Sequence, residues 1–338
     1  MSGVKCTNRK CRIIAGVLAA LILAGVLTGC GTVSYDMQYD TDYGVSSYRV
    51  NVNSSAEKAK FFAQDLCVAD GDIEASGQVN METASVAGLF DLKDADTLYA
   101  KNIYATMNPA SLTKIMTALT ALKYGSTEQV LKASENCIIT ESGAQLSGIK
   151  PGDQMTLNQA LHILLIYSAN DVAIMIAEGV AGSVDGFCNL MNEEAAAIGA
   201  TGSHFLNPNG LTQEGHFVTG YDMYLIFNEA MKYELFNEII QMPSYTTTYT
   251  LANGESKELT VNNTNRYMRD NLATAPEKIT VIGGKTGTTA AAGHCLILLA
   301  RDSAGNPYIS VIMNSDSTDN MYLQMNELLD EINRQIEK

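Results

Sequence analysis

Apolar residues in the middle of the chain recur three or four positions apart, which predicts a group of helices. The first is expected between Pro109 and the stop supplied by Gly125. A second opens at residues 156–159, which have the form of a capping box, and is expected to run to about Tyr167. Two more are expected from Asn170 to Gly182 and from Ser183 to Gly199. The apolar positions of the first of these helices are Leu112, Ile115, Met116, Leu119 and Leu122.

Apolar runs nearer the two ends of the chain predict strands instead. Val86 to Leu92 and Thr97 to Ala100 form a predicted pair around a turn-forming segment. Three later runs are expected to be successive strands, and Asp319 to Glu337 a closing helix. These runs are Ile279 to Gly283, Cys295 to Ala300 and Tyr308 to Met313. The order favours an α/β (α+β) fold, with an antiparallel sheet built from both ends of the domain against a helical subdomain.

The first 29 residues have the pattern of a secretory signal, because four basic residues precede an uncharged apolar run from Ile13 to Val26. That run is too short for a spanning helix, which needs about 20 apolar residues. Small residues before Cys30 resemble the lipobox of bacterial lipoproteins, in which the cysteine is lipidated. An uncleaved signal anchor and an ordinary secretory signal are the alternatives. We therefore expect a lipoprotein signal over 1–29, a lipid-anchored tether over 30–58 and one domain over 59–338.

Composition excludes some functions and leaves others open. All 37 acidic residues follow the signal, whereas four of the 22 basic residues lie within it. Such an acidic mature chain is not suited to binding nucleic acid or anionic lipid. Cys67, Cys137, Cys188 and Cys295 are scattered without metal-ligand spacing, and they could either pair or remain buried free thiols. The four histidines show no metal spacing either, so no metal or other cofactor is expected.

Three short motifs carry candidate chemistry. They are Ser111-Leu112-Thr113-Lys114, Ser168-Ala169-Asn170 and Lys285-Thr286-Gly287. Each is weak alone, because a Ser-x-x-Lys is expected by chance on the order of once in a chain of this size. Ser55-Ala56-Glu57-Lys58 and Ser134-Glu135-Asn136 are such chance matches. Ser111 and Ser168 differ from them because each lies at a predicted helix boundary, where a side chain can face a cleft.

The Ser111 motif suits a nucleophile and its base. Residues three apart share a helix face, so Lys114 can reach the Ser111 hydroxyl. A serine at a helix start also lies near unpaired N–H groups that favour a developing oxyanion. Partial burial and a second cation, Lys285, are expected to lower the pKa of Lys114 so that its amine can act as a base.

The other two motifs suit proton relay and substrate binding. The Ser168 hydroxyl is expected to relay a proton to the leaving amine, and the Asn170 amide to hold a peptide group of the substrate. An edge strand at Lys285-Thr286-Gly287 could bind an extended peptide while Lys285 and Thr286 hold its terminal carboxylate. Glycine there permits close backbone approach. The backbone N–H groups of Thr288 and Ser111 would form the oxyanion hole.

With their flanking residues, these motifs resemble the D-Ala-D-Ala carboxypeptidases among the low-molecular-mass penicillin-binding proteins. The similar strings, from about Ala84 onward, are residues 109–114, 168–171, 204–211 and 283–287. The resemblance implies the β-lactamase/penicilloyl-serine transferase fold, an acyl-enzyme on Ser111, peptidoglycan stem peptides as substrates and β-lactams as covalent inhibitors. It also implies an extracytoplasmic location at the bacterial cell membrane.

The sequence departs from that pattern in two respects. Many relatives continue into a β-rich domain and an amphipathic anchor, which the lipid on Cys30 is expected to replace here. Some relatives place an arginine after the last strand, whereas residues 314–326 contain no Lys or Arg. Carboxylate binding is therefore expected to depend more heavily on Lys285 and Thr286. A class A-like β-lactamase and a non-catalytic wall- or penicillin-binding module are the competing functions, although no segment convincingly supplies a deacylating glutamate.

Overall fold

A computed structural model describes residues 63, 65–77, 79–269 and 272–336 of the chain. They belong to one compact unit that spans Phe61–Lys338. The predicted signal, Cys30 and the tether over 30–58 lie outside the described residues. Within the described part, no helix combines the length and the apolar character needed to cross a membrane.

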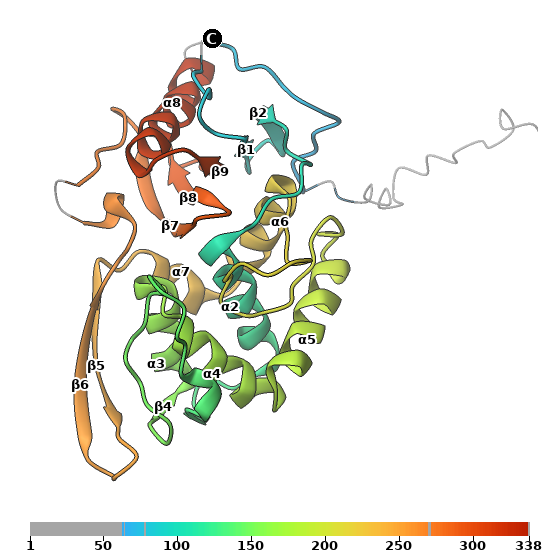
Figure 1. The fold of residues 1–338 in the computed structure, drawn as a ribbon. Coiled ribbons are helices and arrows are strands. Elements are labelled where there is room, and N and C mark those ends of the chain that lie inside the picture. Colours follow the sequence, from blue (N-terminus) through green and yellow to red (C-terminus); the bar gives the residue numbers. More distant parts are fainter. Residues whose placement is uncertain (1–62, 64, 78, 270–271, 337–338) are drawn as a thin grey trace, which may run out of the picture. The chain divides into compact units, whose positions relative to one another are not determined.

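A five-stranded antiparallel sheet forms one half of this unit (Figure 1). Its spatial order is β2-β1-β9-β8-β7, so strands from the two ends of the domain meet where Val86 of β1 pairs with Met313 of β9. The strands are β1 Val86–Asp91, β2 Asp96–Lys101, β7 Thr280–Thr289, β8 Gly293–Arg301 and β9 Pro307–Ser315. The predicted sheet from both ends is thereby confirmed, and β7 becomes an edge strand.

Both faces of this sheet are buried, which explains the continuous apolar runs of its strands. Successive side chains of a strand point to opposite faces. In β8, Leu296 and Leu298 pack with helix α8 (Thr318–Ile336), whereas Ile297 and Leu299 join the core cluster that holds the other helices. The predicted closing helix therefore covers one face of the sheet, and the helical half of the unit covers the other.

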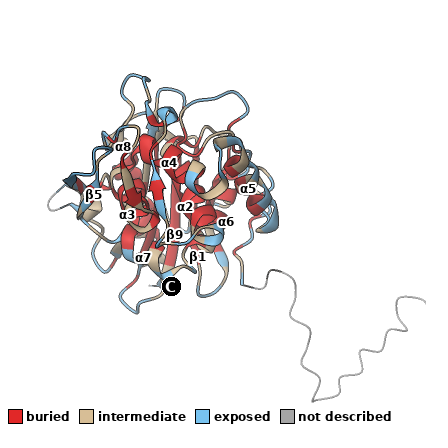
Figure 2. Ribbon diagram, turned by 90° about the horizontal axis from the view of Figure 1, so that it is seen from below, coloured by how far each residue is buried: buried red, intermediate tan, exposed pale blue. Residues whose placement is uncertain are grey.

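The helical half is built around α2 (Thr113–Tyr124), whose first nine residues are buried (Figure 2). The other helices of this half are α3 Leu157–His162, α4 Asn170–Ala181, α5 Val184–Ala197, α6 Gly220–Ala230 and α7 Glu234–Ile240. The capping box at the start of α3 is present, since Thr156 and Gln159 cap each other. The four predicted helices are confirmed, but α6 and α7 were not expected. A π-helical turn, Ile163–Tyr167, continues α3 and ends at Ser168.

A second sheet of four strands was also not predicted. Its order is β3-β4-β5-β6, with β3 Val130–Lys132, β4 Gln154–Thr156, β5 Ser244–Thr250 and β6 Ser256–Asn262. Two of these strands have only three residues. β5 is mostly threonine and tyrosine and leaves every second side chain exposed, so it has little of the apolar contrast by which strands are found.

The cysteines of the described part are free and buried, which settles the open question of pairing for Cys67, Cys137, Cys188 and Cys295. Burial raises the pKa of Cys67 to about 11 and that of Cys295 to about 12. Because the thiolate is the reactive form of cysteine, these thiols are unreactive at neutral pH, where they stay protonated.

Candidate active site

Ser111 lies on a 3-10 turn, Ala110–Leu112, that leads directly into α2. The preceding residue, Ala110, has a φ of 47°, a left-handed conformation that costs an L-residue energy. Gly210 packs against this turn so closely that a Cβ on it would lie 1.8 Å from the Ala110 carbonyl oxygen. Such strain, held in place by close packing, is typical of functional turns.

Lys114, the second residue of α2, is fully buried, and its amine faces three oxygen atoms. Nζ lies 2.9 Å from Ser111 Oγ, 2.7 Å from Asn170 Oδ1 and 2.5 Å from the Asn209 carbonyl oxygen. A protonated amine has three N–H groups and can donate to all three. After losing one proton it can still donate to Asn170 and Asn209, which leaves its lone pair for the Ser111 hydroxyl.

Burial favours that deprotonated form. Desolvation, and next the positive charge of Lys285, hold the pKa of Lys114 well below its ordinary value of 10.5. The negative charge of Asp171 raises the pKa of Lys114 and so opposes these two effects. The environment therefore has the character expected from the sequence, a buried lysine beside a second lysine, and it favours the neutral amine that can accept a proton.

Ser168 and Asn170 lie at the break between the π-helical turn and α4. Ser168 has a φ of 66°, which turns the chain sharply before α4 begins at Asn170. Both residues are about 95% buried. Asn170 directs its carbonyl oxygen to Lys114 and donates its backbone N–H to the Gln145 carbonyl oxygen at 2.8 Å. The break thus brings both side chains to the nucleophile.

Lys285 approaches Ser168 from the edge strand β7. Its Nζ donates to Ser168 Oγ at 2.9 Å and to the Thr286 carbonyl oxygen at 2.8 Å. Only 1% of the residue is exposed, and burial lowers the pKa of Lys285 to about 7. The Thr286 hydroxyl points the other way and shares a 2.7 Å hydrogen bond with the hydroxyl of Thr264.

Gly287 brings the backbone of β7 against the nucleophile turn. A Cβ at Gly287 would lie 3.0 Å from the Ser111 backbone nitrogen and 3.2 Å from that of Leu112. The absence of a side chain is what permits this approach. The next residue, Thr288, is exposed and lines the same cavity as Ser111.

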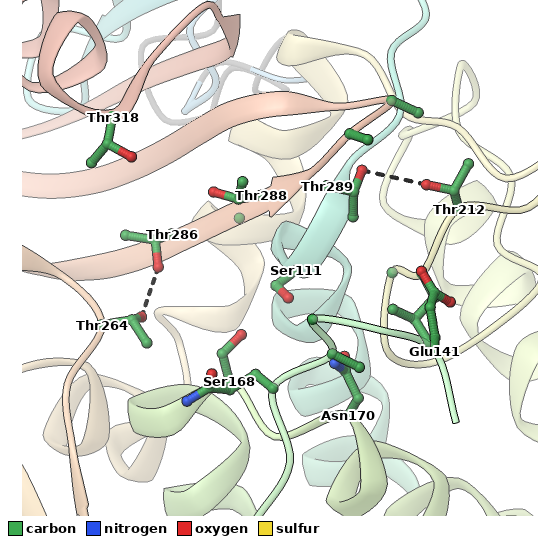
Figure 3. Close-up of a pocket in the computed structure, with 18 of the residues that line it drawn as sticks. Ser111, Glu141, Ser168, Asn170, Thr212, Thr264, Thr286, Thr288, Thr289 and Thr318 are labelled. Carbon is green, nitrogen blue, oxygen red and sulfur yellow. Dashed lines mark hydrogen bonds between the residues drawn. The ribbon is translucent and has the colours of Figure 1, made fainter. Parts of the chain in front are cut away.

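A cavity of about 790 Å³ opens over these residues (Figure 3). Ser111 lies in its middle, with Thr286 and Thr288 of β7 on one side and Ser168 and Asn170 on the other. The three predicted motifs therefore converge. Ser134 instead accepts a hydrogen bond from the Asn136 backbone N–H in a 3-10 turn and lines no part of this cavity.

A loop over residues 141–148 closes one side of the cavity and was not predicted as part of the site. Glu141 and Gln145 line the cavity, and buried Asp171 holds the loop in place. The Asp171 carboxylate accepts from the backbone N–H groups of Ser147 and Gly148 and from the Ser147 hydroxyl, at 2.9–3.0 Å. In the sequence, only the position of Asp171 directly after the second motif could have indicated that this loop belongs to the site.

The segment 204–216 supports the nucleophile from behind, and it too was not assigned a site role. It supplies the Asn209 carbonyl oxygen to Lys114. His216 Nδ1 accepts from the Leu206 backbone N–H, so Nε2 carries the proton and donates to Thr113 Oγ1 at 3.0 Å. Burial lowers the pKa of His216 to about 4, which keeps the ring neutral. Contacts through backbone atoms leave no residue-type signal in a sequence.

The opposite end of the cavity is lined by Thr264, Arg266 and the first turn of α8. Arg266 lies on a 3-10 turn, Arg266–Met268, between β6 and β7. The α8 residues that line the cavity are Thr318, Met321 and Tyr322. Periodicity identified α8 as a closing helix without indicating that its start faces the site. Among the described residues, no cluster of His, Cys, Asp and Glu could hold a metal ion.

The sheet, the helical half and this serine-lysine site define the penicilloyl-serine transferase fold. The crystal structure of the Streptomyces K15 DD-transpeptidase is similar, with a TM-score of 0.68 and 23% identity over 75% of this chain and 98% of that one. A D-alanyl-D-alanine carboxypeptidase from Mycobacterium tuberculosis H37Rv has a TM-score of 0.66 and 26% identity over 77% and 95%. The predicted fold class is confirmed by these neighbours.

Residues 74–317 match the family model of peptidase family S11, described as D-alanyl-D-alanine carboxypeptidase, and the chain belongs to that family. DacF, a D-alanyl-D-alanine carboxypeptidase of Bacillus subtilis, is 32% identical over 73% of this chain and 61% of its own length. DacC of Escherichia coli, with the same description, is 33% identical over 63% of this chain and 52% of its own length. The chain thus spans between half and two thirds of these curated relatives.

Proposed function

We propose that this protein is a serine-type D-alanyl-D-alanine carboxypeptidase that removes the terminal D-alanine from peptidoglycan stem pentapeptides. The observation that carries the proposal is the contact between Lys114 Nζ and Ser111 Oγ at the floor of a cavity bordered by an edge strand. Membership of peptidase family S11 supports the same activity.

Acylation begins with the attack of Ser111 Oγ on the carbonyl carbon between the two terminal D-alanines. The neutral Lys114 amine accepts the hydroxyl proton as the C–O bond forms. General-base assistance of this kind is typically worth about 10² to 10⁴ in rate. The backbone N–H groups of Ser111 and Thr288 donate to the oxyanion, and the loss of one such donor typically costs about 10² to 10³ in turnover.

Collapse of the tetrahedral intermediate breaks the C–N bond. Ser168 passes a proton to the leaving amine and takes up the proton that Lys114 had accepted, so Lys114 is neutral again; Lys285, which donates to Ser168 Oγ at 2.9 Å, supports that transfer. D-alanine departs and an ester remains on Ser111. Water then attacks this ester while neutral Lys114 accepts its proton, and that proton passes to Ser111 Oγ as the ester C–O bond breaks, so one peptide bond and one water are consumed in each cycle.

The substrate is bound as an added strand. β7 is the edge of its sheet, and residues 286–289 line the cavity, so an extended peptide can pair with their backbone. Asn170 faces the cavity from the opposite side and is placed to hold a peptide group. β-Lactams are expected to occupy the same groove and to acylate Ser111.

The test combines a mass measurement with product release. Intact mass after penicillin treatment is expected to increase by one penicilloyl group, which peptide mapping places on Ser111. Purified protein is expected to release D-alanine from a pentapeptide, and Ser111→Ala to lose both reactions. Ser55→Ala, which removes another Ser-x-x-Lys motif, serves as the matched control. Release of D-alanine that survives in Ser111→Ala, or wild-type protein that releases none, would rule the proposal out.

A β-lactamase shares the first half of this mechanism, and one structural feature favours it as the alternative function. Glu141 lines the cavity and provides a carboxylate that the sequence had not suggested for deacylation. A fluorescent penicillin adduct that persists for many minutes in wild type argues against an efficient β-lactamase. A short lifetime that lengthens strongly in Glu141→Gln favours it. A non-catalytic wall- or penicillin-binding module would form the adduct but release no D-alanine.

We also propose that the protein is held at the extracytoplasmic face of the bacterial cell membrane by a lipid on Cys30. The basic and apolar pattern before that cysteine supports this proposal. Cells fed a labelled fatty acid are expected to incorporate label into the wild type and not into Cys30→Ala. Incorporation that is unchanged by the substitution would overturn it.

A further inference from the structure

A second recess, of about 480 Å³, opens beside the active-site cavity and takes no part in the acylation steps described above. It shares Thr288, Thr289 and Ala290 with the cavity, so the two spaces meet along the end of β7. Figure 3 shows Thr286, Thr288 and Thr289 in succession along this strand, beside Ser111. A part of the substrate that extends beyond Thr288 can therefore pass from the cavity into the recess.

Hydrogen bonds between separate elements give the recess its shape. His294 of β8 lines it, and His294 Nδ1 lies 3.3 Å from Thr288 Oγ1 and 3.0 Å from Thr318 Oγ1. This ring thus joins the end of β7 to the start of α8. Elsewhere in the lining, Ser85 Oγ donates to Asn314 Oδ1 at 2.6 Å. Asn314 has a φ of 55°, a left-handed conformation that is uncommon for L-residues and is kept here by these neighbours.

Asp316 gives the recess a negative charge. Of the described residues that line it, Asp316 alone carries a carboxylate, and none is a lysine or an arginine. Its Oδ1 accepts from Asn320 Nδ2 at 2.8 Å, and this hydrogen bond lowers the pKa of Asp316. The carboxylate is therefore ionised at neutral pH. A charged carboxylate in a lining of hydroxyl and amide groups suits a cation that can donate several hydrogen bonds.

The length of the stem peptide brings such a cation to the recess. With the terminal carboxylate at Thr286, an added strand runs antiparallel to β7, and its preceding residues lie toward Thr289. An extended strand rises about 3.3 Å per residue. The residue before the two D-alanines is therefore expected near Thr289 and Ala290, where the recess opens. In peptidoglycan stems this residue is a diamino acid, whose second amine lies at the end of a flexible carbon chain.

We propose that the recess is a subsite for the free ammonium group of this diamino residue, with Asp316 as its counter-ion. The inference rests on the carboxypeptidase function proposed above and specifies which stem peptides the enzyme prefers. An amine that has been joined to another stem is an amide, which carries no charge and cannot pair with Asp316. The enzyme therefore prefers stem peptides that are not cross-linked through this amine.

Glu141 is the carboxylate that lines the active-site cavity itself, but it does not line the recess. The recess offers more than one charge, because the hydroxyls of Thr83 and Ser85 line it together with Asp316. Each of these hydroxyls donates its own proton to a neighbouring amide oxygen, at 3.0 Å from Thr83 and 2.6 Å from Ser85. Their lone pairs remain to accept from an ammonium, which has three N–H groups. The recess therefore fits the ammonium better than Glu141 alone.

The test compares two peptides that differ only in the charge of the side-chain amine, Nα-acetyl-L-Lys-D-Ala-D-Ala and its diacetyl form. Wild type is expected to prefer the free amine in kcat/KM by about three- to fivefold, the size of an exposed ion pair. Asp316→Asn is expected to abolish this preference, and Asp316→Glu to retain part of it. The preference of wild type should also decrease as NaCl is added, because salt screens exposed charges.

Two control variants separate the recess from the general negative charge of the protein. Glu82→Gln removes an exposed carboxylate next to Thr83 that lines neither space, and it is expected to keep the preference of wild type. Glu141→Gln is expected to keep it too. A wild type without the preference overturns the proposal, as does a preference that survives in Asp316→Asn. A loss in either control as large as that in Asp316→Asn also overturns it.

Failure of the carboxypeptidase function itself gives a different pattern. Wild type would then cleave neither peptide, and acylation by a penicillin with an aminohexanoyl side chain and by its N-acetyl derivative provides a second measurement. Asp316→Asn is expected to slow acylation by the amine relative to the acetylated form. A ratio of the two rates that is the same in wild type and Asp316→Asn would reject the subsite independently of peptide cleavage.

Discussion

Lys285 Nζ lies 2.9 Å from Ser168 Oγ, the same separation that joins Lys114 Nζ to Ser111 Oγ. The hydroxyls of Ser111 and Ser168 are therefore each paired with a buried lysine amine. One pair is local, three residues apart on a helix, and the other joins residues 117 positions apart. The charge of Lys285 also contributes to the low pKa of Lys114, after desolvation by burial.

The pH dependence of acylation should move in opposite directions in two variants. The rate constant is expected to rise with pH as Lys114 loses its proton. Lys285→Met removes a charge that lowers the pKa of Lys114, so its rising limb should shift to higher pH. Asp171→Asn removes a charge that raises this pKa, and its limb should shift to lower pH. Stopped-flow acylation by a fluorescent penicillin measures both midpoints, and shifts in the same direction would contradict the proposed base.

The free energy of unfolding should depend on pH because Lys285 is buried. Its pKa is about 7 in the folded protein, below the ordinary 10.5, so folding releases a proton between these pH values. The unfolded state binds more protons there, and the free energy of unfolding should therefore rise with pH across this window, by at most about 1.4 kcal/mol per pH unit. Urea unfolding of wild type and Lys285→Met at pH 7, 8 and 9 measures the difference. A wild type that gains no stability relative to the variant would contradict it.

Gly210→Ala should disturb the nucleophile turn. The added Cβ would lie 1.8 Å from the Ala110 carbonyl oxygen, at a residue with a φ of +83°. We expect the left-handed conformation and the steric overlap together to lower the free energy of unfolding by more than about 2 kcal/mol. Acylation of Ser111 is also expected to be slower. Gly254→Ala is the matched control, because Gly254 has a φ of +86° and no atom within 4 Å of an added Cβ. Thermal unfolding and acylation rates that are alike in the two variants would show that the contact is unimportant.

Asp171→Ala should loosen the loop over residues 141–148. It leaves the backbone N–H groups of Ser147 and Gly148 without their acceptor, at a typical cost of about 1–3 kcal/mol. Hydrogen exchange of the loop is expected to accelerate more than that of β8. Exchange that speeds up equally in both places would indicate global destabilisation instead.

Some of these features could be predicted from the sequence because they depend on regular spacing or on residue type. Ser111 and Lys114 share a helix face by their three-residue separation, and the continuous apolar run of β8 marks a buried strand. The convergence of Lys285 with Ser168 followed from the motifs as a set, not from either one.

Other features could not be predicted for physical reasons. Arg266, Glu141 and Asn209 lie on loops, where no periodicity fixes the direction of a side chain, and Asn209 acts through its backbone carbonyl. β5 presents threonine on both faces, so its alternating burial has no apolar counterpart in the sequence.

The pairing of β1 with β9 has a consequence for folding. Val86 and Met313 are neighbours in the sheet although more than 200 residues separate them, and such distant contacts form slowly because a long loop must close first. A nascent chain that already contains Ser111 and Lys114 still lacks β7 and the second lysine. The complete cavity therefore assembles late in synthesis, when the final strands join the first.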